Sequence, residues 1–405
     1  MSAPPAETPP STIPYVSLAI LAGAGFASSA SIRVSDPLLP QVAAEFAVTA
    51  GQASIIITAF TVAYGLLQIV YGALGDRLGK YRTIIATTML AAAGSLACAL
   101  APTLTTLTIA RFVTAAVSCG VIPLALAWVG DVVPYDRRQR VLARFIAGQI
   151  SGLIFGQIAG GILGDWLGWR AVFAVLAGLH VLAGLAMLAR MAFDPATRRR
   201  AAVPATPTRS LWRAYVDTFG LLKRPWVRRV VGAVALEGFL FFGAFAYVGN
   251  ELKVRFAVDY TVVGLSLAIY GLGGLVYATA SGWLVRVLGE TGLARAGGAL
   301  VGAAFLILAV APTLPVAVAA IALIGLGFYM MHNTLQTHGT QMAPEARGAA
   351  VSVFGSALFL SQSISVALAA PVIDRFGAAP VFAVAGVAIP VLGFAIAAGL
   401  RRRTA

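Results

Sequence analysis

The chain is internally duplicated, and this property constrains its fold more than any other feature of the sequence. The segment 72–79, Gly-Ala-Leu-Gly-Asp-Arg-Leu-Gly, returns about 210 residues later as the segment 282–289, Gly-Trp-Leu-Val-Arg-Val-Leu-Gly. After one deletion, Asp165 and the residues that follow it match Asp374 and the residues that follow it. Because matched turns follow matched apolar segments in the same order, the sequence predicts two homologous halves that run in the same direction.

The composition indicates that lipid surrounds most of the chain. Of the 405 residues, 59% are apolar and only 11% are charged, and the mean hydropathy is +0.88, which exceeds what a soluble core absorbs. Twelve apolar runs have about the 20 residues that a helix needs to cross the hydrocarbon layer. They lie at 15–36, 52–74, 83–101, 104–131, 141–163, 171–191, 228–249, 261–285, 293–311, 314–338, 348–370 and 379–400. We therefore predict an all-α membrane protein with twelve transmembrane helices in two pseudo-symmetric six-helix bundles.

The placement of Lys and Arg predicts the orientation. Most of the 29 basic residues fall in loops on one side of the predicted membrane, and cytoplasmic loops retain such residues. Both termini are therefore expected in the cytoplasm, in a multi-pass protein of the bacterial inner membrane. These basic loops account for the net charge of +14, and they face anionic membrane lipid as topology signals. Because the sequence has no soluble basic domain, nucleic acid is not an expected partner.

The expected domain organisation follows from these spans. It comprises a disordered cytoplasmic tail at 1–14, six-helix bundles at 15–191 and 227–400, a basic cytoplasmic linker at 192–226, and a cytoplasmic tail at 401–405. The linker is either an anchor at the membrane surface or a regulatory site. Since the sequence lacks a nucleotide-binding loop and metal-ligand spacing, no metal or cofactor is expected, and a membrane receptor or enzyme is a remote alternative.

The loop between the second and third spans combines glycine with charge. Its defined positions are Gly72, Leu74, Asp76, Arg77, Gly79, Lys80 and Arg82. With this motif and twelve spans, the chain resembles the major facilitator superfamily, and within it the twelve-span drug/proton antiporter group, over essentially its whole length. The resemblance implies a secondary active transporter that exports small amphipathic or drug-like compounds by alternating access. It also implies a monomer, a small-molecule substrate, protons as the coupling ion and the proton gradient as the driving force.

The resemblance also implies a conformational lock at this loop. In the family, the acid of the motif meets the N-terminus of the eleventh helix, and the basic residues meet an acid at the end of the fourth. The corresponding residues here are Asp76 and Asp131, with Lys80 among the basic residues. A carboxylate suits the positive end of a helix dipole, so a charge lock between the halves is physically reasonable.

Two further family signatures are only partly matched. On the fourth helix Arg111 stands where the family has an arginine associated with proton movement, but the following Gln and Gly are absent. Arg111 is therefore either functional or an anchor at the outer end of the helix. The antiporter motif of the fifth helix is represented by Gly152, Gly156, Gln157, Gly160 and Gly161, with Gln157 in place of proline. These glycines either simply pack two helices or have a specific antiport role.

Acids inside spans are the natural proton-coupling groups, because protonation removes the cost of burying a carboxylate. Glu237 lies near the middle of the seventh span among apolar and aromatic residues and is the first candidate; the alternative is a structural hydrogen bond to a neighbouring helix. Asp36 follows Arg33 by three residues, which places both on one helical face. These two residues either form an extracellular ion pair or bind proton and substrate.

The predicted substrate cavity draws on polar and aromatic residues within the spans. Asn333 and Gln336 belong to a polar stretch of the tenth span, and Tyr64 and Phe242 to a set of aromatic residues that favours lipophilic or weakly cationic solutes. Arg33 is placed in the same cavity. The alternative is a transporter of sugars, organic anions or other metabolites, with Arg33 or Arg111 as an anion clamp.

Overall fold

The computed structural model describes residues 13–202 and 210–404, and within these ranges the chain is helical and contains no strand. Residues 1–12 of the expected N-terminal tail and 203–209 of the expected linker lie outside the described residues. The helices of the N-terminal half are α1 (Tyr15–Arg33), α2 (Ser35–Glu45), α3 (Ala50–Ala53), α4 (Ile55–Leu78), α5 (Lys80–Ala99), α6 (Leu104–Ser118), α7 (Val121–Val132), α8 (Tyr135–Leu167) and α9 (Trp169–Phe193).

The described parts of the expected linker are also helical. They are α10 (Pro195–Ala202), α11 (Leu211–Gly220) and the 3-10 turn η1 (Leu221–Lys223). The C-terminal half comprises α12 (Pro225–Glu237), the π-helix η2 (Gly238–Phe242), α13 (Gly243–Phe245), α14 (Val248–Phe256), α15 (Tyr260–Val310), α16 (Leu314–Gln341), the 3-10 turn η3 (Pro344–Ala346), α17 (Arg347–Phe376) and α18 (Ala379–Thr404).

Eleven helices among the described residues are long and apolar enough to cross a membrane. One of them, α15, has 51 residues and is interrupted at Gly289, where φ is 62° and ψ is 174°. This turn divides α15 into two spans, so the structure agrees with the prediction of twelve. Apolar side chains such as Leu90, Leu182 and Phe394 are exposed on the outside of the bundles, as expected for surfaces that face lipid.

Four glycines form the turns that the duplication predicts. Gly79, Gly168, Gly289 and Gly377 are the glycines with positive φ in the described chain, between 62° and 86°. Gly79 corresponds to Gly289, and Gly168 to Gly377. Glycine adopts this backbone conformation without the steric penalty that a Cβ would add, so each half conserves its tight turns through its glycines.

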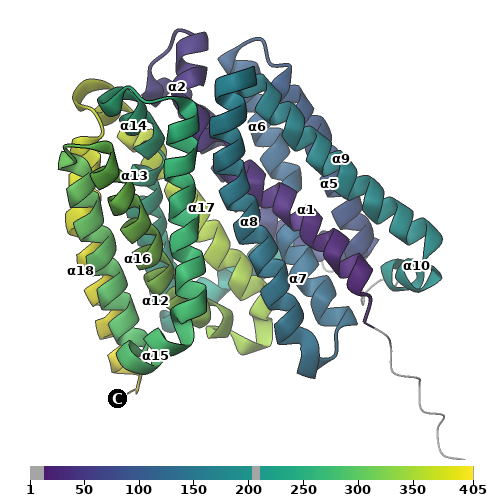
Figure 1. The fold of residues 1–405 in the computed structure, drawn as a ribbon. Coiled ribbons are helices and arrows are strands. Elements are labelled where there is room, and N and C mark those ends of the chain that lie inside the picture. The colour runs from purple at the N-terminus through teal and green to yellow at the C-terminus, as the bar shows by residue number, and fades with distance from the viewer. Residues whose placement is uncertain (1–12, 203–209, 405) are drawn as a thin grey trace, which may run out of the picture.

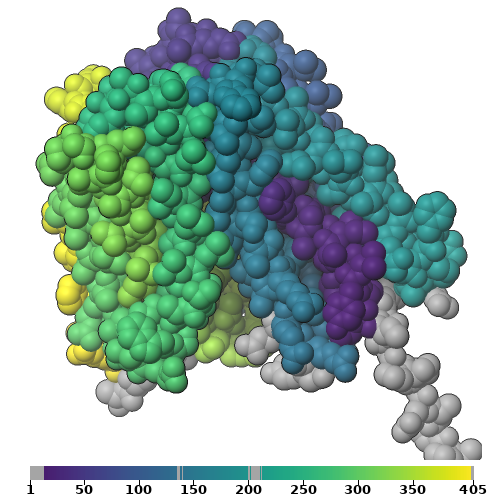
Figure 2. Space-filling view, in the orientation of Figure 1, coloured from purple at the N-terminus to yellow at the C-terminus, as the bar shows by residue number. Residues whose placement is uncertain are grey.

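The two halves form separate bundles that meet at one end of the molecule (Figure 1). We call the end that carries α2 and α14 the far end, and the end that carries Gly79, Gly289 and the C-terminus the basic end. At the far end a continuous apolar core joins the bundles, and it includes Leu38 of α2 and Leu252 of α14. Towards the basic end the bundles diverge, and Figure 2 shows the surface hollowed between them.

The seventh span departs from the continuous helix that its apolar run predicts. It is broken into α12, η2, α13 and α14. Two glycines allow this region to lie directly against α17: a Cβ built on Gly238 would lie 2.5 Å from Ser361 Oγ, and one built on Gly243 would lie 1.8 Å from Ser365 Oγ. A π-helix inside a longer helix frequently marks a functional site, and this one begins immediately after Glu237.

Candidate functional site

The centre of the C-terminal bundle contains a buried acid paired with a histidine. Glu237 is the last residue of α12 and is 0% exposed, and its Oε2 lies 2.7 Å from Nδ1 of His332 on α16. Its Oε1 has no hydrogen-bond partner among the described residues. The His332 ring stacks on Phe328, with centroids 4.9 Å apart. The sequence identified Glu237 but not His332, since Asn333 and Gln336 were the expected contacts on this helix.

The π-helix connects this pair to the N-terminal bundle. Phe242, its last residue, lies under the guanidinium of Arg33, whose Cζ is 4.1 Å from the ring centroid. Arg33 is the last residue of α1, and its Nη1 lies 3.6 Å from Asp36 Oδ2, beyond ordinary hydrogen-bond distance. Both charged side chains are buried. A buried ion pair of one bundle therefore touches an aromatic ring of the other, five residues from Glu237.

Arg111 lies near this ion pair within the N-terminal bundle. Its Nη1 donates a hydrogen bond to the backbone carbonyl of Ser31 at 3.0 Å, and its Cζ lies 3.9 Å from the centroid of the Phe60 ring. The side chain is 1% exposed, and it is close enough to Asp36 to interact with it electrostatically. Arg111 thus contacts α1 beside Asp36, which suits either of the roles expected from the sequence.

The five residues predicted to line the substrate cavity fall in different places. Arg33 and Phe242 are in contact with each other. Tyr64 is buried where α4 meets α17, with its ring centroid 4.5 Å from that of Phe359. Asn333 donates a hydrogen bond to the Tyr329 carbonyl of its own helix, and Gln336 is exposed. These residues therefore do not form one lining in this conformation of the protein.

A cavity of about 610 Å³ lies between the two bundles at the basic end. Its lining comes from both bundles and from α11, and includes Gln68, Gly72, Asp76, Lys80, Leu124, Asp217, Thr218, Gly348 and Ser352. Deeper between α4 and α17, Gln68 Nε2 donates to Ser356 Oγ at 3.3 Å, and the hydroxyl oxygens of Thr61 and Ser363 are 2.8 Å apart. These contacts join α4 and α17 between the cavity and the far end.

The glycine-rich loop forms one wall of this cavity. Lys80 Nζ lies 2.6 Å from Asp131 Oδ2 at the end of α7 and 4.0 Å from Asp76 Oδ1. Asp76 and Gly348, in the first turn of α17, both line the cavity. The loop therefore places Lys80 beside the acid that the family pattern indicates, and Asp76 and the start of α17 both line the cavity. The lock assignment of Gly72, Arg77 and the other loop residues stays a prediction.

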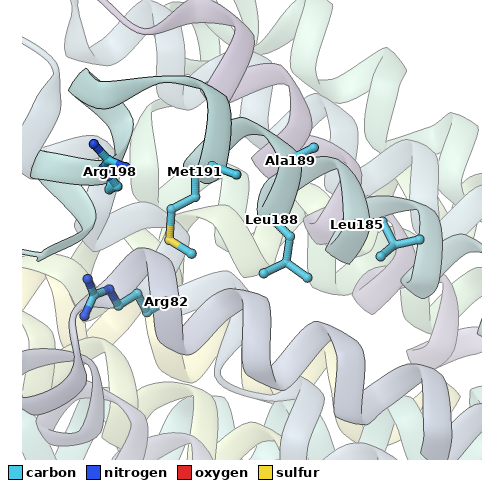
Figure 3. A pocket seen from close by; sticks show the side chains of 7 residues that line it. Arg82, Leu185, Leu188, Ala189, Met191 and Arg198 are labelled. Atoms are coloured by element: carbon cyan, nitrogen blue, oxygen red, sulfur yellow. The ribbon is translucent and has the colours of Figure 1, made fainter.

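Arg82 belongs to a different surface. It lines a groove of about 580 Å³ on the outside of the N-terminal bundle, together with Arg198 of α10 and apolar residues of α9 such as Leu188 and Met191. Figure 3 shows the two arginines at one end of this groove. Lys80 and Arg82 of the loop are thus separated: Lys80 forms an ion pair at the cavity, and Arg82 lines a groove on the outer face of the bundle.

The glycines of α8 bring three helices into close contact. A Cβ built on Gly156 would lie 2.4 Å from the Ala30 carbonyl oxygen of α1, and Gly152 makes a similar approach to the same helix. Gly160, four residues further along the same face, packs on Pro37 of α2. On another face, a Cβ built on Gly161 would lie 2.7 Å from the Cα of Gly264 in α15. Gln157 is buried beside them. The geometry gives these glycines a packing function, and an additional antiport role stays a prediction.

Two six-helix bundles that enclose a cavity open at one end define a polytopic membrane transporter. A family model described as Major Facilitator Superfamily matches residues 21–366. The chain belongs to the major facilitator superfamily, as the loop motif and the duplication predict. Transporters of this superfamily carry small molecules. The family and the apolar helices together make the chain a multi-pass membrane protein.

Individual relatives are distant. The chain is 27% identical over 376 residues to the uncharacterized MFS-type transporter YwfA of Bacillus subtilis, covering 92% of this chain and 88% of that protein. It is 27% identical over 296 residues to the MFS-type transporter clz19 of Cochliobolus lunatus, but this match spans only 56% of that protein. It is also 25% identical over 267 residues to the chloramphenicol resistance protein of Streptomyces lividans, covering 66% of each chain.

Proposed function

We propose that the protein exports small amphipathic or drug-like compounds in exchange for protons, by rocking its two bundles about a central site. The observation that carries the proposal is the buried pair of Glu237 and His332, a proton-binding unit inside the membrane. Family membership supports transport in general, and the relative named for chloramphenicol resistance supports drug efflux.

The hydrogen bond between Glu237 and His332 can form whether Glu237 is ionised or protonated. When Glu237 is ionised, a protonated Nδ1 of His332 donates to the carboxylate, and when Glu237 is protonated, its hydroxyl donates to a neutral Nδ1. Protonation changes the charge next to η2, whose Phe242 lies against Arg33 of the other bundle. The proton thereby biases a contact between the bundles, which is what coupling to alternating access requires.

The proposal assigns directions to the two ends. The protein lies in a bacterial inner membrane with its basic end and both termini in the cytoplasm, because the basic loops are at that end. The 610 Å³ cavity is then the cytoplasmic entrance, and the protein is held in an inward-facing state as a monomer. Bundles at 15–191 and 227–400, joined by the linker at 192–226, move relative to each other.

A second candidate function is transport of organic anions or sugars. It is favoured by the buried arginines, since Arg33 Nη1 and two nitrogens of Arg111 lack hydrogen-bond partners among the described residues. Unpaired guanidinium N–H groups suit a carboxylate. We rank this function second because Arg33 already contacts Asp36 and two phenylalanine rings, which leaves the arginine partly neutralised.

The test is transport by purified protein in liposomes under an imposed pH gradient, with chloramphenicol and a panel of lipophilic cations and organic anions. We expect Glu237→Gln to lower gradient-driven flux about tenfold or more, the effect of losing about 1.4 kcal/mol of differential interaction. Glu290→Gln is the matched control, since Glu290 pairs with His338 at 3.0 Å but is largely exposed. Undiminished flux in Glu237→Gln contradicts proton coupling through this pair, and gradient-driven flux of organic anions alone favours the second function.

A further inference from the structure

Two aspartates cross between the bundles at the far end. Asp374, near the end of α17, accepts the backbone N–H of Gly51 through Oδ1 at 2.8 Å and the hydroxyl of Thr49 through Oδ2 at 2.7 Å. Asp165, near the end of α8, accepts the backbone N–H groups of Tyr260 and Thr261 at 3.3 and 3.1 Å. Each carboxylate therefore binds the first turn of a membrane span in the opposite bundle.

The two contacts are equivalent under the internal duplication. Asp165 corresponds to Asp374 in the duplicated sequence, and Gly51 corresponds to Thr261. One aspartate reaches from the N-terminal bundle to the start of α15, and the other from the C-terminal bundle to the start of the span Ala50–Leu78, which α3 and α4 form together. We call these two contacts the far-end clasps.

The physical basis of a clasp is the helix N-terminus. The first N–H groups of a helix lack partners within the helix, and the aligned peptide dipoles make this end positive. A carboxylate that accepts these N–H groups gives them hydrogen-bond partners and places its negative charge at the positive end of the helix. Neighbouring glycines allow it to approach: a Cβ on Gly51 would lie 2.5 Å from Asp374 Oδ2, and Gly161 lies directly against Gly264 beside the other clasp.

At the basic end the duplicated sequence offers Asp76 in a comparable position, at the end of α4. Asp76 and the start of α17 both line the cavity, but the counterpart of Asp76 in the second half is Arg286, which cannot accept an N–H. Two clasps at the far end are thus opposed by at most one at the basic end. This imbalance agrees with the arrangement of the protein, which is packed at the far end and open at the other.

We propose that Asp165 and Asp374 are paired positioning residues that hold the far end shut and set the resting state of the transport cycle. Both carboxylates must leave their helix N-termini before the bundles separate at this end. The role in transport rests on the alternating access proposed above, whereas the effect on the conformational equilibrium requires neither substrate nor proton coupling. The two proposals therefore fail independently.

The experiment measures the conformational equilibrium of the full chain in lipid nanodiscs without substrate. Spin labels are placed at Pro102 and Pro312, which are exposed and occupy equivalent far-end loops, and their distance distribution is recorded by pulsed electron resonance. We expect Asp165→Asn and Asp374→Asn each to raise the ratio of far-end-open to far-end-closed molecules about threefold or more, and the double variant to combine both effects. Substrate transport is not part of the readout.

Asp259→Asn is the matched control. Asp259 immediately precedes α15, at the same helix end that Asp165 binds, but its side chain makes no capping hydrogen bond. The substitution removes the same charge and should leave the distances unchanged. Gly51→Ala provides a second approach, because its added methyl group would meet both Asp374 Oδ2 and the Ala370 carbonyl oxygen of α17 without changing any charge, and it should shift the equilibrium in the same direction. Distances in the double variant that equal those of the wild type, or an equal shift in Asp259→Asn, overturn the proposal.

Discussion

Glu237 and His332 are joined by a buried hydrogen bond between the seventh and tenth membrane spans, with 2.7 Å between Oε2 and Nδ1. A second pair of the same chemistry uses the same helix: His338 Nε2 lies 3.0 Å from Glu290 Oε2, and the Glu290 side chain is 52% exposed. The same two side-chain types therefore meet once inside the protein and once at its surface. The surface pair is a natural control for the buried one.

Replacing His332 by Leu leaves the Glu237 carboxylate buried without its partner. We expect this substitution to destabilise the protein by about 1–3 kcal/mol, because a buried carboxyl group loses its hydrogen-bond partner. Thermal unfolding in detergent measures the loss. His338→Leu removes the partner of an exposed carboxylate and should cost less than about 1 kcal/mol. Equal losses from the two substitutions would show that burial of Glu237 does not matter.

The sequence predicted the architecture because its signals are local and repeated. Twelve apolar runs give twelve spans by length alone, and the repeated glycines Gly79 and Gly289 mark turns that both have positive φ. The duplication then requires the two bundles to share one fold. The break of the seventh span at Glu237 was not predictable in this way, since it depends on Gly238 and Gly243 packing against α17.

The candidate site was predictable only in part. A carboxyl group in the middle of an apolar run is conspicuous, so the sequence singled out Glu237. Its partner His332 lies 95 residues away on another helix, and periodicity within one helix does not say which face meets which neighbour. For the same reason, the face of α16 on which Gln336 lies did not follow from the sequence; Gln336 is exposed, and its place in a substrate cavity stays a prediction. A pairing between helices is a property of the packed bundle.

The close contact at Gly156 provides a test of helix packing. A methyl group added there would lie 2.4 Å from the Ala30 carbonyl oxygen, and backbone atoms cannot rotate away. We expect Gly156→Ala to destabilise the protein by about 1–3 kcal/mol. Gly148 lies on the same helix, but a Cβ there would meet its nearest neighbour at 3.6 Å, an ordinary contact. Gly148→Ala should therefore leave the melting temperature unchanged or raise it slightly, and a similar loss for both variants contradicts the packing argument.

The duplicated turn allows backbone strain to be separated from crowding. Gly79 and Gly289 both have positive φ, so alanine at either position should cost about 1–2 kcal/mol. At Gly79 a Cβ would also lie 2.5 Å from the Ala201 carbonyl oxygen, whereas at Gly289 it would meet nothing within 4 Å. Gly79→Ala should therefore reduce thermal stability more than Gly289→Ala. The reverse order would exclude the contact with α10 as a source of strain.

The pair of Lys80 and Asp131 tests whether the glycine-rich loop controls conformation or merely stabilises the fold. The Asp131 side chain is 52% exposed, so Asp131→Asn should lower stability by less than about 1 kcal/mol. Without Asp131, Lys80 remains near Asp76 and competes with the start of α17 for that carboxylate. We therefore expect the variant to favour the state open at the basic end, as detected by faster alkylation of a cysteine placed at Ser352 in the cavity. If Asp131→Asn changes neither the alkylation rate nor the transport rate, the ion pair of Lys80 and Asp131 is too weak to favour either state. The assignment of this pair to the conformational lock is then wrong.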